Sequence, residues 1–425
     1  MAQESVMRLD SVSIKYGPGA TREVGFDMGE LGATRVMVVT DPNLVNKGPV
    51  KVTIKALEDA GLETALYSST RIEPTDASLK DAIDFATKGK FDGFVAVGGG
   101  SSMDTAKVAD LYSTYPADFA TYVNAPIGKG TPVPGALKPL ICIPTTAGTG
   151  SETTGVAVFD LVEMHAKTGI AHRYLRPTIG IVDPDNTRIL PSMVAACTGF
   201  DVLAHALESF TAIPYSQRQA PENSLLRPAY QGSNPLSDVW AVRAIEMVSS
   251  NLVRVVNDPT DEEARSQMIM AATFAGISFG TAGTHLAHGM SYPVSGMVRS
   301  FIPEGYPQDH PIIPHGMAVI LLAPSVFRFT APTNPERHLE AARLMGADTT
   351  NSKTEDAGNI LANAIVSLMR ETGMPNGLTA VGFTEADVDT LVEGTLPQQR
   401  VTRLSPRPFT PDDLRQMFLD SLTYW

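Results

Sequence analysis

The segment Val95-Ala96-Val97-Gly98-Gly99-Gly100-Ser101-Ser102-Met103-Asp104 has the pattern of a buried strand, a glycine turn and the start of a helix. Glycines let a backbone approach a phosphate closely, and the N–H groups of the first helical turn then face the anion. The segment lacks the Gly-x-Gly-x-x-Gly spacing of ordinary dinucleotide folds. A plain turn is the alternative, but the preceding strand and following helix favour a pyrophosphate-binding turn.

Strands and helices alternate around this segment. Apolar runs typical of strands occur at residues 35–40, 64–67, 91–97 and 140–143, and β-rich segments follow at 156–159, 168–171 and 178–182. Helical patterns occupy residues 50–60, 75–87 and 101–111. Such alternation implies a parallel sheet with right-handed crossovers, so the first part of the chain is predicted to be a Rossmann-like α/β domain.

The second part of the chain is helical in pattern. Helices are predicted at residues 194–212, 235–251, 262–278, 315–329, 336–345, 357–371, 385–393 and 411–421. We therefore predict a dinucleotide-binding α/β domain over residues 1–187 and an all-α metal-binding and substrate domain over residues 188–425. Two long non-helical insertions, 214–234 and 292–314, interrupt the helical part, and insertions of this length favour functional loops.

Composition limits the class of protein. A length of 425 residues favours two domains, and a formal net charge of −13 argues against nucleic acid and anionic membranes as partners. The two cysteines, Cys142 and Cys197, lie in apolar runs, which predicts buried thiols in a reducing compartment. Because the N-terminus shows neither a signal peptide nor an Arg-rich presequence, we expect a cytoplasmic protein, or a mitochondrial matrix protein if a eukaryotic presequence has been removed.

The segment Gly199–Glu208 offers the first candidate metal ligands. Asp201 and His205 are four residues apart in a helical pattern, so their side chains share one helix face and could hold a divalent cation. The alternative is a capping or core role. Two further imidazoles, His288 and His315, are each followed by glycine. One aspartate and three histidines would make a four-ligand site with room for a substrate oxygen.

Two other features follow predicted strands. Asp41 closes the strand at 35–40, where a carboxylate can bind adenosine ribose hydroxyls and would repel a 2′-phosphate, which favours NAD over NADP. A turn or helix cap is the alternative for Asp41. The segment Ile143–Glu152 is dense in hydroxyls and glycine and could bind ribose and phosphate, whereas a solvated turn is the alternative there.

Four runs occur here in the order in which they occur in the iron-containing (group III) alcohol dehydrogenases, and the chain resembles that family over nearly its whole length. These runs are Gly98–Asp104, Pro144–Glu152, Gly199–Glu208 and Pro314–Gly316. Further segments resemble the hydroxyacid–oxoacid transhydrogenase branch, namely Tyr16–Gly19, Glu73–Asp76, Ala125–Gly130, Arg227–Pro235 and Gly394–Arg400. The implied architecture is shared with dehydroquinate synthase.

The resemblance implies a role for each matching residue. It assigns the metal ligands to Asp201, His205, His288 and His315. It assigns pyrophosphate binding to Gly98, Gly99, Gly100 and Ser101. It assigns contacts with ribose and neighbouring groups to Asp41, Thr145, Thr146 and Lys167. It places Asp104, Thr149 and Ser151 toward the nicotinamide. The implied cofactors are NAD and a divalent metal, first Fe²⁺, with Zn²⁺ or another ion as alternatives.

One position departs from the family pattern. Many members have His-x-x-x-His-Pro, with the second histidine beside the nicotinamide, whereas this chain has His288-Gly-Met-Ser-Tyr292-Pro293. Tyr292 could donate a hydrogen bond, but its ordinary pKa near 10 makes it a poor base. His285, one turn before His288 on a predicted helix, could take over the proton relay, or it could be an ordinary interior histidine.

The branch oxidises 4-hydroxybutyrate to succinic semialdehyde while it reduces 2-oxoglutarate to 2-hydroxyglutarate, so a hydroxyacid and an oxoacid are the expected small-molecule substrates of a homo-oligomeric enzyme. An ordinary NAD-dependent alcohol or 4-hydroxybutyrate dehydrogenase that releases NADH is the alternative. A dehydroquinate synthase-like lyase would need more lysines near the ligands, and a scaffold would need no converging histidines. The insertions contain Arg218, Arg227 and Arg299, and we expect at least one of these arginines to bind the substrate carboxylate, with solvated loop arginines as the alternative.

Overall fold

The computed structural model of the chain describes residues 3–164, 166–224 and 227–425, and these form two compact units. One unit is Asp10–Leu190, and the other is Pro191–Trp425 together with the N-terminal segment that ends at Leu9. The predicted boundary at residue 187 lies close to this division. The sequence patterns do not predict that the N-terminal segment belongs with the second unit.

The first unit contains a six-stranded parallel sheet in the order β1-β8-β5-β4-β2-β3. Its strands are β1 Ser13–Tyr16, β2 Arg35–Val39, β3 Glu63–Tyr67, β4 Gly93–Gly98, β5 Leu140–Pro144 and β8 Ile179–Val182. A separate antiparallel ribbon pairs β6 Val156–Leu161 with β7 Ala166–Ala171. The helices of the unit are α1 Val24–Glu30, α2 Gly48–Asp59, α3 Asp76–Gly89 and α4 Gly100–Thr114.

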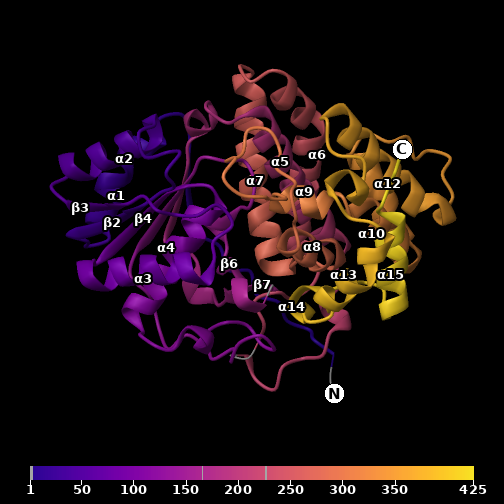
Figure 1. The fold of residues 1–425 in the computed structure, drawn as a ribbon, viewed down its shortest axis with the longest axis horizontal. Helices are drawn as coiled ribbons and strands as arrows, with labels where there is room; N and C mark the ends of the chain where they lie inside the picture. Colours follow the sequence, from indigo (N-terminus) through magenta and orange to yellow (C-terminus); the bar gives the residue numbers. More distant parts are fainter. Residues whose placement is uncertain (1–2, 165, 225–226) are drawn as a thin grey trace. The chain divides into compact units, whose positions relative to one another are not determined.

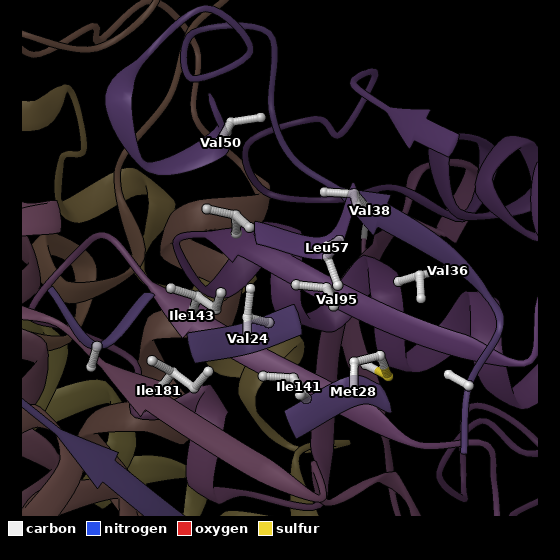
Figure 2. Packing of buried hydrophobic residues seen from close by; sticks show 13 residues of the cluster. Val24, Met28, Val36, Val38, Val50, Leu57, Val95, Ile141, Ile143 and Ile181 are labelled. Carbon is white, nitrogen blue, oxygen red and sulfur yellow. The ribbon is translucent and has the colours of Figure 1, made fainter. Parts of the chain in front are cut away.

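Alternate side chains of each strand point to opposite faces of the sheet, and helices cover both faces, so both faces are buried. Val36 and Val38 of β2 join a core cluster with residues of α1 and α2, and Figure 2 shows this packing. Met37 and Val39 of the same strand join a second cluster with residues of α3 and α4. The helices cover the two faces of the sheet in these pairs (Figure 1). Cys142 of β5 lies in the second cluster, which confirms its predicted burial.

The second unit is built from helices and has no named strand within its described residues. These are α5 Ser192–Thr211, α6 Pro235–Asn257, α7 Glu262–Ala282, α8 Leu286–Gly296, α9 His315–Ile320, α10 Ala323–Thr330, α11 Pro335–Leu344, α12 Ala357–Glu371, α13 Val388–Thr395, α14 Gln399–Thr402 and α15 Pro411–Asp420. Helix α5 packs against α6, α7 and α9 (Figure 1). Its residues are buried from Gly199 to its end. The predicted combination of an α/β and an all-α part is confirmed.

Two details of the helix prediction are wrong. Residues 315–329 form two helices, α9 and α10, with a turn at Leu321 and Leu322 between them. Pro324 has no backbone N–H and lies in the first turn of α10, which is the position where a helix tolerates proline. The insertion predicted to be non-helical from Tyr292 begins later, since α8 continues through Pro293 to Gly296.

The N-terminal segment contacts the insertion after α5. Gln3 forms an antiparallel bridge with Gln219, and the Glu4 carboxylate accepts from Arg227 at 3.1 and 3.3 Å. The backbone of Arg8 exchanges hydrogen bonds with the Gln231 side chain at 2.8 and 2.7 Å. These contacts anchor the insertion at both ends. None of the helices in the described part of the chain is long and apolar enough to cross a membrane.

Candidate metal centre and its surroundings

The four predicted ligand side chains converge in the helical unit. Oδ1 of Asp201 lies 3.8 Å from Nε2 of His205, 3.6 Å from Nε2 of His288 and 3.8 Å from Nε2 of His315. Ligand atoms of Asp201, His288 and His315 all lie within 4.8 Å of one another. The residues come from three helices, α5, α8 and α9, so the sequence segments that were far apart meet at one point.

Glycine brings α9 to α5. A Cβ atom on Gly316 would lie 2.0 Å from the carbonyl oxygen of Cys197 and 2.8 Å from Cβ of Asp201. Only glycine permits this approach, because a side chain would push the start of α9 away from α5. The residue before it, His315, is thereby held beside Asp201. The glycine in the predicted His-Gly element therefore has a structural reason.

The cluster has the spacing of donors that share an ion. Separations of 3.6–3.8 Å are too long for hydrogen bonds. Two ligands that each lie about 2.0–2.2 Å from a tetrahedral ion would be roughly 3.4 Å apart. Among the described residues, buried Oδ1 of Asp201 and Nε2 of His288 have no hydrogen-bond partner, which is costly unless something else binds them. Asp201, His288 and His315 therefore fit a divalent metal such as Fe²⁺ or Zn²⁺, and His205 lies outside this group of three but within 3.8 Å of Asp201.

Glu208 is the residue of this centre that the prediction missed. It is completely buried on α5, and its Oε1 accepts backbone N–H groups of His285, Ala287 and His288 at 3.1, 2.8 and 3.3 Å. Its Oε2 pairs with Nδ1 of His288. With a proton on Nδ1, the neutral His288 ring directs the lone pair of Nε2 at Asp201. Carboxylates that accept from metal-binding histidines fix the tautomer in this way. The sequence signal was its spacing, three residues after His205 on the same helix face.

The buried charges set the protonation of the cluster. Burial lowers the pKa of His205 to about 3, so the ring is neutral at physiological pH and can bind a cation. Burial acts to lower the pKa of His288 as well, but Glu208 and Asp201 outweigh it and raise this pKa to about 9, so a cation that binds Nε2 must displace a proton. Burial acts to raise the pKa of Asp201, and the surrounding histidines, first His205 and His315, bring it well below its usual range.

Aromatic rings enclose the cluster. The His205 ring stacks on Phe279 at a centroid distance of 3.9 Å with 8° between the planes. The Tyr292 ring lies 6.1 Å from the His315 ring, and its hydroxyl accepts a hydrogen bond of 3.0 Å from Nη2 of Arg400. Tyr292 therefore lies beside the cluster, in contact with an arginine that was not among the predicted site residues.

His285 occupies an interior position. It is the residue before α8 and not within the helix, and its side chain has no exposed surface. Its Nε2 lies 3.0 Å from the Thr211 hydroxyl, and its Nδ1 lies 3.3 Å from Oε1 of Glu208. Burial lowers its pKa. These contacts resemble those of an ordinary interior histidine, and its predicted relay role stays a prediction.

The predicted nucleotide-binding residues lie in the α/β unit, and all but Asp104 of α4 and Lys167 of β7 follow the carboxyl ends of strands of the sheet. Gly98 ends β4, α4 begins at Gly100, and the Thr145 N–H donates to the Gly98 carbonyl at 3.0 Å. A Cβ on Gly100 would lie 2.5 Å from Cγ2 of Thr149. The turn after β4 and the hydroxyl-rich segment after β5, which includes Thr146, are therefore in direct contact. The N-terminus of the 15-residue helix α4 lies at this point.

Three further residues of the predicted nucleotide set have partners within the α/β unit. The Asp41 carboxylate accepts the Asn43 N–H at 2.9 Å, so it caps its own turn, and burial raises its pKa. The Asp104 carboxylate accepts from the Ser151 hydroxyl at 2.7 Å. The Asn43 contact agrees with the alternative that Asp41 caps a turn. It uses Oδ1 of Asp41, and the carboxylate still lies at the end of β2.

Lys167 is almost completely buried on β7. Its ammonium group lies 2.6 Å from a carboxylate oxygen of Glu73 and 3.0 Å from one of Asp160. Burial acts to lower its pKa, but the two carboxylates, first Asp160, raise it above the usual lysine range. The positive charge of Lys167 is thus matched by protein carboxylates.

The three predicted substrate arginines also have protein partners. Arg218 donates to the Tyr230 carbonyl, and Arg227 pairs with Glu4 at 3.1 Å. Arg299 is exposed and pairs with Asp387. No contact in the described chain joins any of the three to the Asp201 cluster, and their role in binding a carboxylate stays a prediction.

Comparison with known proteins gives a consistent set of relatives. Residues 11–184 match the family "Iron-containing alcohol dehydrogenase", and residues 229–422 match "Fe-containing alcohol dehydrogenase family, C-terminal". The chain is 53% identical to a Rattus norvegicus protein named "Hydroxyacid-oxoacid transhydrogenase, mitochondrial", across 96% of this chain and 88% of the relative.

Solved structures agree at lower identity. A 1,3-propanediol oxidoreductase superposes with a TM-score of 0.85 at 27% identity, covering 98% of this chain and 100% of its own. A sulfoacetaldehyde reductase from Bifidobacterium kashiwanohense, solved in complex with NAD⁺, gives a TM-score of 0.80 at 28% identity and covers 98% of each chain. The similarity therefore extends over both units.

Proposed function

The chain belongs to the iron-containing alcohol dehydrogenase family, in its hydroxyacid–oxoacid transhydrogenase branch, and we propose that it moves hydride from 4-hydroxybutyrate to 2-oxoglutarate through a nicotinamide that stays bound. It is an oxidoreductase. The observation that carries the proposal is the cluster of one buried carboxylate and three imidazole nitrogens within 3.6–3.8 Å of it.

In this proposal Asp201, His205, His288 and His315 hold a divalent metal, with Fe²⁺ as the first expectation. When bound, the metal supplies a Lewis acid that lowers the pKa of an alcohol, and the nicotinamide supplies the hydride acceptor. Glu208 keeps the Nδ1 proton of His288 in place and so fixes which nitrogen faces the site. The stacked ring of Phe279 covers His205 and excludes water from that side.

The α/β unit would bind NAD. The turn Gly98–Ser101 and the N-terminus of α4 would receive the pyrophosphate. Thr145 and Thr146 would contact the ribose and neighbouring groups, and Thr149 and Ser151 would lie toward the nicotinamide. Asp41 would bind the ribose hydroxyls and disfavour NADP. The NAD⁺ complex of the Bifidobacterium kashiwanohense relative supports this choice of cofactor. Asp104 and Lys167 would act by positioning, since both are engaged by protein groups.

Location and assembly belong to the proposal as well. The Rattus norvegicus relative is named as mitochondrial, which fits the matrix alternative better than the cytoplasmic expectation. A homo-oligomer stays a prediction. The second candidate function is an NAD-dependent dehydrogenase that releases NADH, and the similarity to 1,3-propanediol oxidoreductase favours it.

The test uses purified, metal-loaded enzyme with 4-hydroxybutyrate and 2-oxoglutarate and no added nucleotide. The proposal expects succinic semialdehyde and 2-hydroxyglutarate in equal amounts, with no free NADH in solution. Omitting 2-oxoglutarate should stop the reaction after one turnover. Product that forms only when NAD is added, with NADH released in equal amount, would replace the proposal with the dehydrogenase function.

A further inference from the structure

Arg400 is a cation that has no carboxylate partner among the described residues. It is half-buried on α14, where Nη2 donates to the Tyr292 hydroxyl at 3.0 Å and the guanidinium lies 5.0 Å from the centre of the Tyr230 ring. Its Nη1 is buried and has no hydrogen-bond partner among the described residues. Both neighbours are neutral phenols, and no carboxylate of the described chain lies within ion-pair distance of this guanidinium.

This arrangement is costly in the absence of a ligand. A guanidinium withdrawn from water loses solvation, and proteins ordinarily pair such a charge with a carboxylate. The chain does so elsewhere: Arg227 pairs with Glu4 at 3.1 Å, and Arg337 pairs with Asp238 at 2.8 Å. At Arg400 the protein supplies only the neutral side chains of Tyr292 and Tyr230. The guanidinium charge has no carboxylate partner and Nη1 makes no hydrogen bond, so Arg400 is suited to bind a planar anion such as a carboxylate.

Arg400 borders the histidine cluster by two routes. Tyr292 joins them directly, since its ring is 6.1 Å from the His315 ring and its hydroxyl contacts Arg400. On the other side, the Tyr230 ring packs edge-on against Phe279 at 6.4 Å, and Phe279 stacks on His205.

Backbone packing fixes the position of α14. A Cβ on Gly289 of α8 would lie 2.4 Å from Cγ2 of Thr402, so the glycine after His288 lets α14 approach α8. Arg400 and Tyr292 are therefore held on two packed helices, and Arg400 is only partly buried. Arg218 contributes indirectly, because it binds the carbonyl of Tyr230 and so supports the ring beside Arg400.

We propose that Arg400 binds the remote carboxylate of the hydroxyacid, and that Tyr292 donates its hydroxyl proton to the same carboxylate. The lone pair of Tyr292 already accepts from Nη2, so its own hydrogen is available to donate. The carboxylate would then receive a guanidinium N–H of Arg400 and the phenol O–H. This inference rests on the proposed function for the identity of the substrate and deepens it by giving the reason for selecting acids over simple alcohols.

The test compares one acid and one uncharged alcohol of equal carbon number, 4-hydroxybutyrate and 1-butanol, on metal-loaded enzyme. Arg400→Ala should lower kcat/KM for 4-hydroxybutyrate roughly ten- to a hundredfold and change that for 1-butanol less than about twofold. Arg400→Lys, which keeps the charge and loses the planar fork, should show a smaller loss on the acid alone. Arg403→Ala removes an exposed arginine at the end of the same helix and should change neither activity.

A binding measurement separates this site from turnover. Calorimetric titration with butyrate, which has no hydroxyl and cannot react, should show weaker binding to Arg400→Ala than to wild type by a similar factor. Equal losses on both substrates, or butyrate affinity unchanged by Arg400→Ala, would overturn the inference. If the wild type fails to oxidise 4-hydroxybutyrate although Arg400→Ala weakens butyrate binding, the carboxylate site stands and the proposed function fails.

Discussion

The β6–β7 ribbon and the junction of α8 with α14 each hold a cation out of full contact with water, yet they treat its charge differently. Lys167 on the ribbon lies between Glu73 and Asp160 at 2.6 and 3.0 Å. Arg400 at the junction has a phenol and an aromatic face. A buried cation that pairs with protein carboxylates needs no ligand, whereas one without a carboxylate partner indicates where an anionic ligand could bind.

The same contrast separates the polar groups of the two units. Asp104 and Lys107 in the α/β unit are occupied by protein donors and acceptors, including the Ser151 hydroxyl, which lies 2.7 Å from Asp104 and 2.6 Å from Lys107. Oδ1 of Asp201 in the helical unit faces imidazoles at distances that no hydrogen bond spans. Measurements of stability and of ligand binding can therefore distinguish the groups that support the fold from those that bind a ligand.

The largest effect should come from the unmatched cluster. His315→Ala should lose bound metal and roughly a thousandfold or more in activity, since a metal contributes several kcal/mol of transition-state stabilisation. The fold should persist, because Asp201 keeps two of its three imidazole neighbours, His205 and His288. Elemental analysis and circular dichroism would measure both. His310→Ala, which alters a histidine paired with Asp309 at 2.8 Å, is the control. Full metal occupancy in His315→Ala would exclude it as a ligand.

The matched cation should behave in the opposite way. Lys167→Met should lower the free energy of unfolding by about 2–3 kcal/mol, because it leaves Glu73 and Asp160 side by side with each about one-quarter exposed. Urea denaturation of nucleotide-free protein would measure this. Lys80→Met, which removes an exposed helix pair with Asp76, should cost about 0.5 kcal/mol or less. Arg400→Ala should cost less than Lys167→Met, and the reverse order would break the comparison.

Glu208 lies between the two cases, since protein donors satisfy it while it contacts His288, a proposed metal ligand. Glu208→Gln should weaken metal affinity about ten- to a hundredfold, the usual effect of altering a carboxylate behind a metal-binding histidine. The amide keeps an acceptor for the backbone N–H groups, so the start of α8 should stay in place. Competition with a chelator would measure the affinity. Glu340→Gln, on an exposed glutamate paired with Arg343, is the control, and equal affinities in the two variants would remove Glu208 from this role.

Sequence patterns located most of the fold because long, strongly patterned segments are the easiest to identify. Strand β1 was not predicted, since its four residues are half-buried or exposed at the sheet edge and show no apolar run. Helix α1, with seven residues, was also too short to stand out. The break between α9 and α10 shows that an apolar period alone does not reveal a turn within it.

The candidate site was predictable where neighbours in sequence share a helix face, as Asp201 and His205 do. It was not predictable where partners come from distant segments. Glu208 meets His288 across 80 residues, and Arg400 meets Tyr292 across 108. The charge and length of the insertions favoured their arginines as binders of the substrate carboxylate. Which guanidinium lacks a carboxylate partner depends on the directions of the side chains, and the sequence does not give these directions.

The N-terminal segment has a consequence for how the protein emerges from the ribosome. Glu4 is synthesised 223 residues before its partner Arg227, and Arg8 precedes Gln231 by the same interval. The whole of the Asp10–Leu190 unit can leave the exit tunnel and form its sheet during that delay. The N-terminal segment cannot form these contacts until the insertion has been synthesised. An affinity tag fused ahead of this segment would therefore adjoin contacts that form only after the insertion has been translated.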